Sequence, residues 1–94
     1  MLISFAQRVS VPSDVLIREV EGQSVILSLQ SERYFGLDEM GTRMWTALTT
    51  CESIQAAYEA LLSEYDVDGE LLRRDLQDLI ARLVEHGLVE VSGE

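Results

Sequence analysis

The hydrophobic residues change their spacing near residue 38. Before it, residues 15–20 (VLIREV) and 24–30 (SVILSLQ) are rich in Val, Ile and Leu, which is typical of strands. Glu21-Gly22-Gln23 lies between them and favours a hairpin, because a glycine occupies the short loop. A tight turn at Ser31-Glu32 leads into residues 33–37 (RYFGL), a third short strand. These three segments predict an antiparallel meander.

The segment before the hairpin and the second strand of the hairpin each show a further pattern. Residues 2–9 (LISFAQRV) predict a short peripheral strand, and Pro12 marks a break before the next one. Along residues 24–30, apolar and polar positions alternate, so one face of that strand is wholly apolar and the other is mixed.

Beyond Leu37 the apolar residues recur at helical spacing in three segments. Asp38 is a good N-cap for the first helix, and Ser53 or Thr50 can cap the second. The third helix has Asp68 as its cap and runs to about His86.

The chain ends in an apolar segment after the third helix. Gly87 stands where a left-handed C-cap is wanted, and residues 88–91 indicate a brief closing strand or an extended tail. Strands followed by three helices predict an α+β fold that resembles a winged helix-turn-helix. We expect a three-stranded antiparallel sheet packed on three helices, in a single domain over residues 1–94.

The net charge of the chain excludes some classes of binding partner. Seventeen acidic residues face seven arginines and no lysine, which gives a net charge of −10. Such a chain is repelled by nucleic-acid phosphates and by anionic membrane surfaces, so we expect neither as a partner. The single cysteine excludes an internal disulfide, and no targeting signal or long apolar segment is visible. We therefore expect a cytoplasmic protein.

Catalytic and metal-binding motifs are missing from the sequence. One histidine and one cysteine cannot supply a common zinc motif, and the six glycines stand singly rather than in a phosphate-binding loop. His86 fits a helix-capping role, and Cys51 fits a small hydrophobic residue between two helices. We expect no enzyme activity, no cofactor and no metal ion.

The winged-helix order also permits a transcriptional regulator. A recognition helix normally presents basic and amide side chains to DNA. Here the second helix has no basic residue, and the third offsets its three arginines with four acidic residues. A regulator that binds DNA or a protein therefore remains an alternative that the charge disfavours.

Residues 33–37 carry the other candidate site. A third strand at the end of a meander leaves backbone N–H and C=O groups unpaired at one edge, and such an edge can accept an extended peptide as an added strand. The simpler interpretation is that Tyr34 and Phe35 only pack on the two faces of the sheet. The same edge could pair with a second copy, so weak self-association is also allowed.

The two strand segments before residue 31 and the block at residues 33–45 (RYFGLDEMGTRMW) carry a resemblance that covers the span 13–91. This span resembles the PqqD-like proteins, which recognise the leader segments of ribosomally made, modified peptides. The block RYFGLDEMGTRMW is closest to the stand-alone members that accompany lasso-peptide systems. The other residues that carry the resemblance are Gly41, Trp45, Asp75, Leu76, Leu79, Leu83, Gly87, Leu88 and Val89.

The resemblance implies a non-catalytic module that holds the leader of a precursor peptide. The leader would add as a strand to Arg33, Tyr34, Phe35, Gly36 and Leu37, and the opposite wall would be Leu72, Asp75, Leu76 and Leu79. A pocket near Tyr34 or Phe35 would receive the aromatic ring of a Tyr-x-x-Pro motif. Asp75 could fix the register by pairing with a basic leader residue.

The implied partner is a separate cysteine peptidase that removes the leader. A second alternative within the family is a peptide chaperone for a radical-SAM enzyme, as in pyrroloquinoline quinone synthesis.

Overall fold

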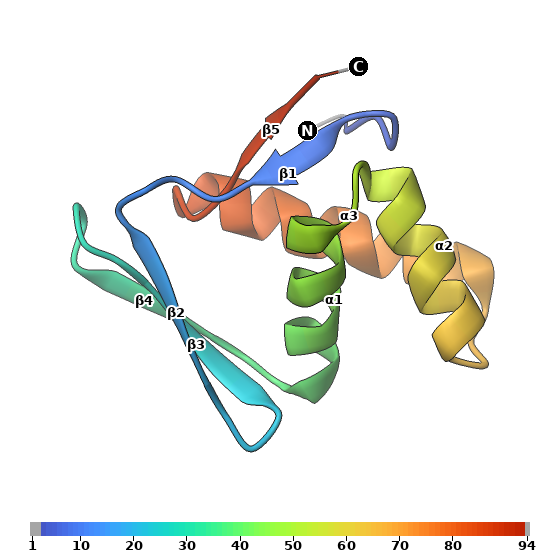
Figure 1. The fold of residues 1–94 in the computed structure, drawn as a ribbon, viewed down its shortest axis with the longest axis horizontal. Coiled ribbons are helices and arrows are strands. Elements are labelled where there is room, and N and C mark those ends of the chain that lie inside the picture. Colours follow the sequence, from blue (N-terminus) through green and yellow to red (C-terminus); the bar gives the residue numbers. More distant parts are fainter. Residues whose placement is uncertain (1–2, 94) are drawn as a thin grey trace.

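The computed structural model describes residues 3–93 and places three helices and two antiparallel sheets within them (Figure 1). The larger sheet has the strand order β2-β3-β4, and β1 pairs with β5 in a separate two-stranded sheet. This arrangement confirms the predicted α+β fold. The elements are β1 (Arg8–Ser10), β2 (Val15–Val20), β3 (Gln23–Ser28), β4 (Arg33–Leu37), α1 (Glu39–Thr50), α2 (Ile54–Glu64), α3 (Gly69–Glu85) and β5 (Glu90–Ser92).

The predicted hairpin between β2 and β3 closes through a two-residue turn. Glu21 and Gly22 have φ angles of 53° and 83°, so both occupy the left-handed region that a type I′ turn requires. Val20 therefore pairs directly with Gln23, and β3 begins one residue earlier than the sequence pattern predicted.

The mixed face of β3, not its apolar face, is turned toward the helices. Ser24, Ile26 and Ser28 are buried, whereas Val25 on the opposite face is 46% exposed. The two serines are tolerated inside because each hydroxyl has a hydrogen-bond partner. The hydroxyls of Ser24 and Thr42 share a hydrogen bond of 2.7 Å between β3 and α1, and the Ser28 hydroxyl accepts one of 3.4 Å from the Ser31 N–H.

The apolar side of the sheet therefore faces solvent. We call it the outer face. The registers of β2, β3 and β4 place on it Leu16, Val20, Val25, Leu27 and Tyr34.

The Ser24–Thr42 hydrogen bond yields a stability prediction. Replacing Thr42 by valine keeps the side-chain shape but leaves the buried Ser24 hydroxyl without its partner. We expect the free energy of unfolding to fall by about 1–3 kcal/mol in urea denaturation. Adding Ser24→Ala should recover part of that loss, because the unpaired hydroxyl is removed. An equal or larger loss in the double variant would contradict this explanation.

The three predicted helix caps are confirmed. The Asp38 carboxylate accepts a hydrogen bond of 2.8 Å from the Gly41 N–H, and the Ser53 hydroxyl accepts one of 3.0 Å from the Ala56 N–H. The Asp68 carboxylate accepts from the N–H of Glu70 at 2.8 Å. These side chains satisfy backbone donors that have no partner inside the helix, and so they fix where each helix begins.

The end of α3 also follows the sequence. His86 is the C-cap, and Gly87 adopts a φ of +71°. The Gly87 N–H donates to the Val84 carbonyl, and the Leu88 N–H donates to the Leu83 carbonyl, a Schellman motif that redirects the chain toward β5.

The predicted strand over residues 2–9 is wrong in its extent. Strand β1 spans only Arg8–Ser10, because the residues before it form a turn in which Ser4 accepts from the Ala6 N–H and donates its own N–H to Gln7. Serine side chains compete in this way with strand pairing. Carbonyls of this turn accept hydrogen bonds from the first backbone N–H groups of α2, at 2.8 Å each. Leu2, the first residue of the predicted strand, lies outside the described residues.

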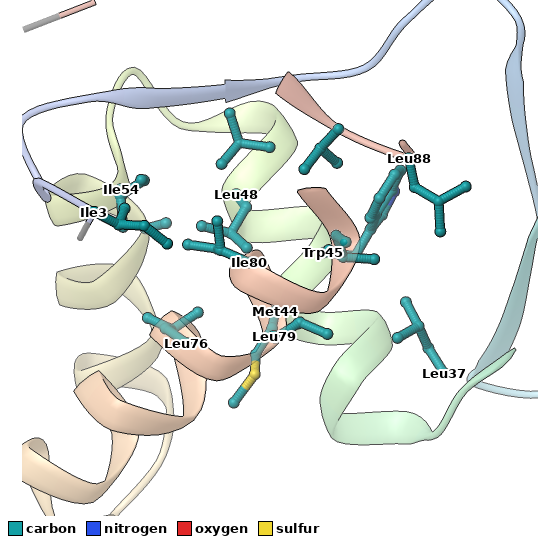
Figure 2. Packing of buried hydrophobic residues seen from close by; sticks show 14 of the residues in the cluster. Ile3, Leu37, Met44, Trp45, Leu48, Ile54, Leu76, Leu79, Ile80 and Leu88 are labelled. Atoms are coloured by element: carbon teal, nitrogen blue, oxygen red, sulfur yellow. The ribbon is translucent and has the colours of Figure 1, made fainter. Parts of the chain in front are cut away.

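The core lies among the three helices, with contributions from Ile26, Leu37 and the segment after α3. Leu76, Leu79 and Ile80 project from α3 into this cluster, and Trp45 of α1 lies in it together with Leu88 (Figure 2). None of the helices within residues 3–93 is long and apolar enough to cross a membrane.

An exposed ion pair joins α1 to α2. The guanidinium of Arg43 donates to the Glu64 carboxylate at 3.0 and 2.6 Å, and this contact lowers the pKa of Glu64. Both side chains remain more than 40% exposed, so solvent screening leaves the pair a minor contributor to stability.

Candidate functional site

Strand β4 has an open edge. Within the described residues it pairs with β3 on one side only, since β4 is the last strand of the sheet. Its free edge presents backbone N–H and C=O groups over Arg33–Leu37.

A groove of about 480 Å³ lies beside this strand and reaches α1 and α3. Its apolar surface comes from the side chains of Phe35, Leu37, Met40, Met44 and Leu79, while its charged residues lie on α3 and at the start of α1. The residues that line it are Phe35, Gly36, Leu37, Asp38, Met40, Gly41, Met44, Asp75, Asp78, Leu79 and Arg82.

Phe35 is held at the end of the groove by the C-cap of α3. Its ring meets the His86 imidazole edge-to-face, with ring centroids 5.3 Å apart. His86 is itself fixed, because its Nδ1 lies 2.8 Å from the Arg82 carbonyl oxygen. His86, which the sequence predicted as a helix-capping residue, therefore also positions the aromatic side chain of Phe35 in β4.

The two aromatic residues of β4 point to opposite sides of the sheet. Phe35 pairs with Ile26 on the buried face, whereas Tyr34 pairs with Leu27 on the outer face and is 76% exposed. Only Phe35 lines the groove. This alternation resolves the register of β4, which the sequence left open.

The predicted site residues separate into two groups. Five of them come together in the groove: Phe35, Gly36, Leu37, Asp75 and Leu79. Arg33 begins β4 on the same face as Phe35, and Tyr34 lies on the outer face.

Leu72 and Leu76 do not form the opposite wall of the groove. Their exposed fractions are 2% and 0%, because they face the other helices and belong to the core. The wall from α3 is supplied instead by residues that share the side of the helix with Asp75, at spacings of three and four.

Six groove residues were missed at the sequence level. Met40 and Met44 have the four-residue spacing of a core stripe, and they do pack on the core while also contributing to the groove. Asp78 and Arg82 were recognisable as helical neighbours of Asp75, since they lie three and seven positions after it. The other two missed residues are Asp38 and Gly41.

The single cysteine of the chain lies away from the groove. Cys51 follows the last turn of α1, whereas the groove lies along the first turns of that helix. Among residues 3–93, no three His, Cys, Asp or Glu side chains are grouped so that they could hold a metal ion.

Comparison with known proteins identifies the family. Residues 23–89 match the family model described as coenzyme PQQ synthesis protein D (PqqD). A search of curated proteins found no significant match.

Two solved structures share the fold. One is TbiB1 in complex with the TbiA(beta) leader peptide, at 30% identity and a TM-score of 0.81, over 90% of this chain and 99% of that one. The other is lasso peptide synthetase B1 complexed with the leader peptide, at 22% identity and a TM-score of 0.75, over 90% and 98% of the two chains. Together with the family match over residues 23–89, the similarity to TbiB1 shows that the chain belongs to the PqqD family.

Proposed function

We propose that this protein binds the leader segment of a ribosomally made precursor peptide and presents it to a separate leader peptidase during lasso-peptide maturation. The observation that carries the proposal is the open edge of β4 beside a groove lined by both apolar and charged side chains. The family match and the similarity to TbiB1, a relative solved with a leader peptide, support it.

The leader would add to the sheet as a fourth strand. Backbone hydrogen bonds along Arg33–Leu37 would provide affinity that depends little on leader sequence. Alternate leader side chains would enter the groove, where Phe35, Met40 and Leu79 offer apolar contacts. An aromatic leader residue fits beside Phe35, because aromatic rings favour edge-to-face or offset contacts.

The protein itself would perform no chemistry on the peptide. Its single histidine is occupied with Phe35 and the α3 C-cap, and its single cysteine caps α1. Neither belongs to an arrangement of nucleophile, base and orienting group. Cleavage would therefore fall to the partner.

The outer face of the sheet is a surface for that partner. Leu16, Val20 and Tyr34 are 53%, 59% and 76% exposed there. A bound leader would extend this face by one strand, and so a protein that covers it would also contact the leader. Contiguous exposed apolar surface of this kind commonly marks an interface between proteins.

Binding is tested directly by fluorescence anisotropy with the labelled leader of the neighbouring precursor. We expect saturable binding near or below the micromolar range, about −8 kcal/mol. A duplex DNA control should give no signal. Binding of the duplex without binding of the leader would instead favour the alternative function, a winged-helix transcriptional regulator.

Strand addition is tested by the positions at which N-methylation of the leader weakens binding. In a paired edge strand, every second N–H donates to its neighbour and the others point away. Methyl groups at successive positions should therefore weaken binding by about five- to tenfold at alternate positions, with little effect between them. A uniform effect, or none, would argue against backbone pairing.

A further inference from the structure

We propose, building on the proposed function, that the groove selects the direction and register of the leader by an order of charges along it. The preferred leader segment has a basic side chain, then an apolar one two residues later, then an acidic one after two more. The three would face the groove together, since alternate residues of a strand share a face.

One end of the groove is acidic. Asp38 lies there directly after β4, as the N-cap of α1, and Asp75 is the first residue of α3 that lines the groove. Both residues are exposed, and Asp78, also exposed, lies between Asp75 and Arg82 along the helix. A basic leader side chain would be attracted to this end.

The other end is basic. Arg82 lines the groove one helical turn before the C-cap His86, which contacts Phe35. Arg33 does not line the groove, but it begins β4 on the same face as Phe35, beyond this end. An acidic leader side chain would be attracted to this end.

Because β4 and α3 run in opposite directions, the acidic residues of the two walls lie toward one end of the groove and the basic residues toward the other. The contact of Phe35 with His86 places the middle of β4 at the end of α3, and β4 then runs toward the start of α1 (Figure 1). A leader paired antiparallel to β4, like every other pair in this sheet, would pass the acidic end first. Antiparallel pairing is also slightly more stable per residue than parallel pairing.

The spacing of the leader charges follows from the two walls. Asp75 and Arg82 are seven helical residues apart, roughly 10 Å along the axis. Arg33, just beyond the groove lining, and Asp38, just after β4, are five residues of extended backbone apart, roughly 16 Å. A basic and an acidic leader residue four positions apart are separated by about 13 Å, between these two values. Two leader charges that are two or six residues apart would be separated by about 7 or 20 Å, and neither distance matches the spacing of charges on either wall.

Asp78 and Arg82 have the spacing of a helical ion pair, and they could instead neutralise each other. Among residues 3–93, however, the structure forms no salt bridge between them, although both line the groove. Both charges therefore remain free to meet a peptide.

The proposal is tested by selecting displayed random twelve-residue peptides on the full chain. We expect enriched peptides to carry Lys or Arg four residues before Asp or Glu, with an apolar residue midway. The charge-inverted variant Asp75→Arg, Asp78→Arg, Arg82→Glu should enrich the opposite order. In a matched control, Glu70→Arg with Arg74→Glu changes charges of the same helix that do not line the groove, and it should leave the order unchanged.

A selected peptide with its two charges exchanged should bind the natural chain about fivefold more weakly, and the charge-inverted variant should restore its binding. Enriched peptides without this charge order, or with the same order on the inverted variant, would overturn this inference and leave strand addition standing. If neither chain enriches any peptide, the proposed function fails as well.

Discussion

Replacing Leu76 by alanine should lower the free energy of unfolding by about 2–5 kcal/mol. Leu76 is fully buried on α3, among the core residues drawn in Figure 2, and truncating it would leave a cavity between helices. Urea denaturation measures the loss. Leu71→Ala is the matched control, because it makes the same change on the same helix at a side chain that is 46% exposed. The control should cost about 0.5 kcal/mol or less.

The same variant separates a core role of Leu76 from a role in the groove. Where the variant remains folded, its leader affinity should stay within about threefold of the original, because the side chain does not line the groove. A large loss of affinity with little loss of stability would contradict the placement of Leu76 in the core.

Replacing Phe35 by alanine should weaken leader binding by about thirtyfold, which corresponds to the roughly 2 kcal/mol of a hot-spot residue. The change removes the aromatic ring of the groove and its contact with His86. Anisotropy titration measures the loss, at a temperature where circular dichroism shows the variant folded.

Tyr34→Ala is the matched control for Phe35. It removes an aromatic side chain from the adjacent position of the same strand, but from the outer face, where Tyr34 is 76% exposed. Leader affinity should change by less than about threefold. Equal losses in the two variants would mean that the leader does not enter the groove beside Phe35.

The sequence predicted the fold well wherever local interactions decide the structure. Asp38, Ser53 and Asp68 were recognisable as helix caps because each satisfies backbone donors within its own first turn. The Glu21-Gly22 turn was recognisable from another local signal, since glycine readily adopts the left-handed angles of such a turn.

Long-range pairing decided the features that the sequence did not show. Alternation along β3 distinguishes two faces, but it does not tell which one the helices cover. The buried face is the one that carries Ile26 into the core and pairs the Ser24 hydroxyl with Thr42 of α1, and both contacts are long-range. The pairing of β1 with β5 joins residues 80 to 84 positions apart and has no local signal.

The candidate site was predictable on β4 and only partly on α3. The edge position of residues 33–37 follows from the meander, so the strand was found. On α3, Leu72 and Leu76 belong to the same apolar arc of the helix as Leu79. Only the packing in the structure shows that Leu79 lies where this arc borders the groove. Once Asp75 is placed in the groove, helical spacing predicts that Asp78 and Arg82 lie on the same side of α3.

Amide hydrogen exchange of this protein with saturating leader tests whether the peptide joins the sheet at β4. Backbone amides of residues 33–37 should exchange more slowly when the peptide is bound, because the open edge gains partners. Strand β2 is the internal control, since Val15–Val20 form the opposite open edge of the same sheet and should be unaffected. Protection of β2 instead of β4, or no change in β4 at saturation, would contradict the account.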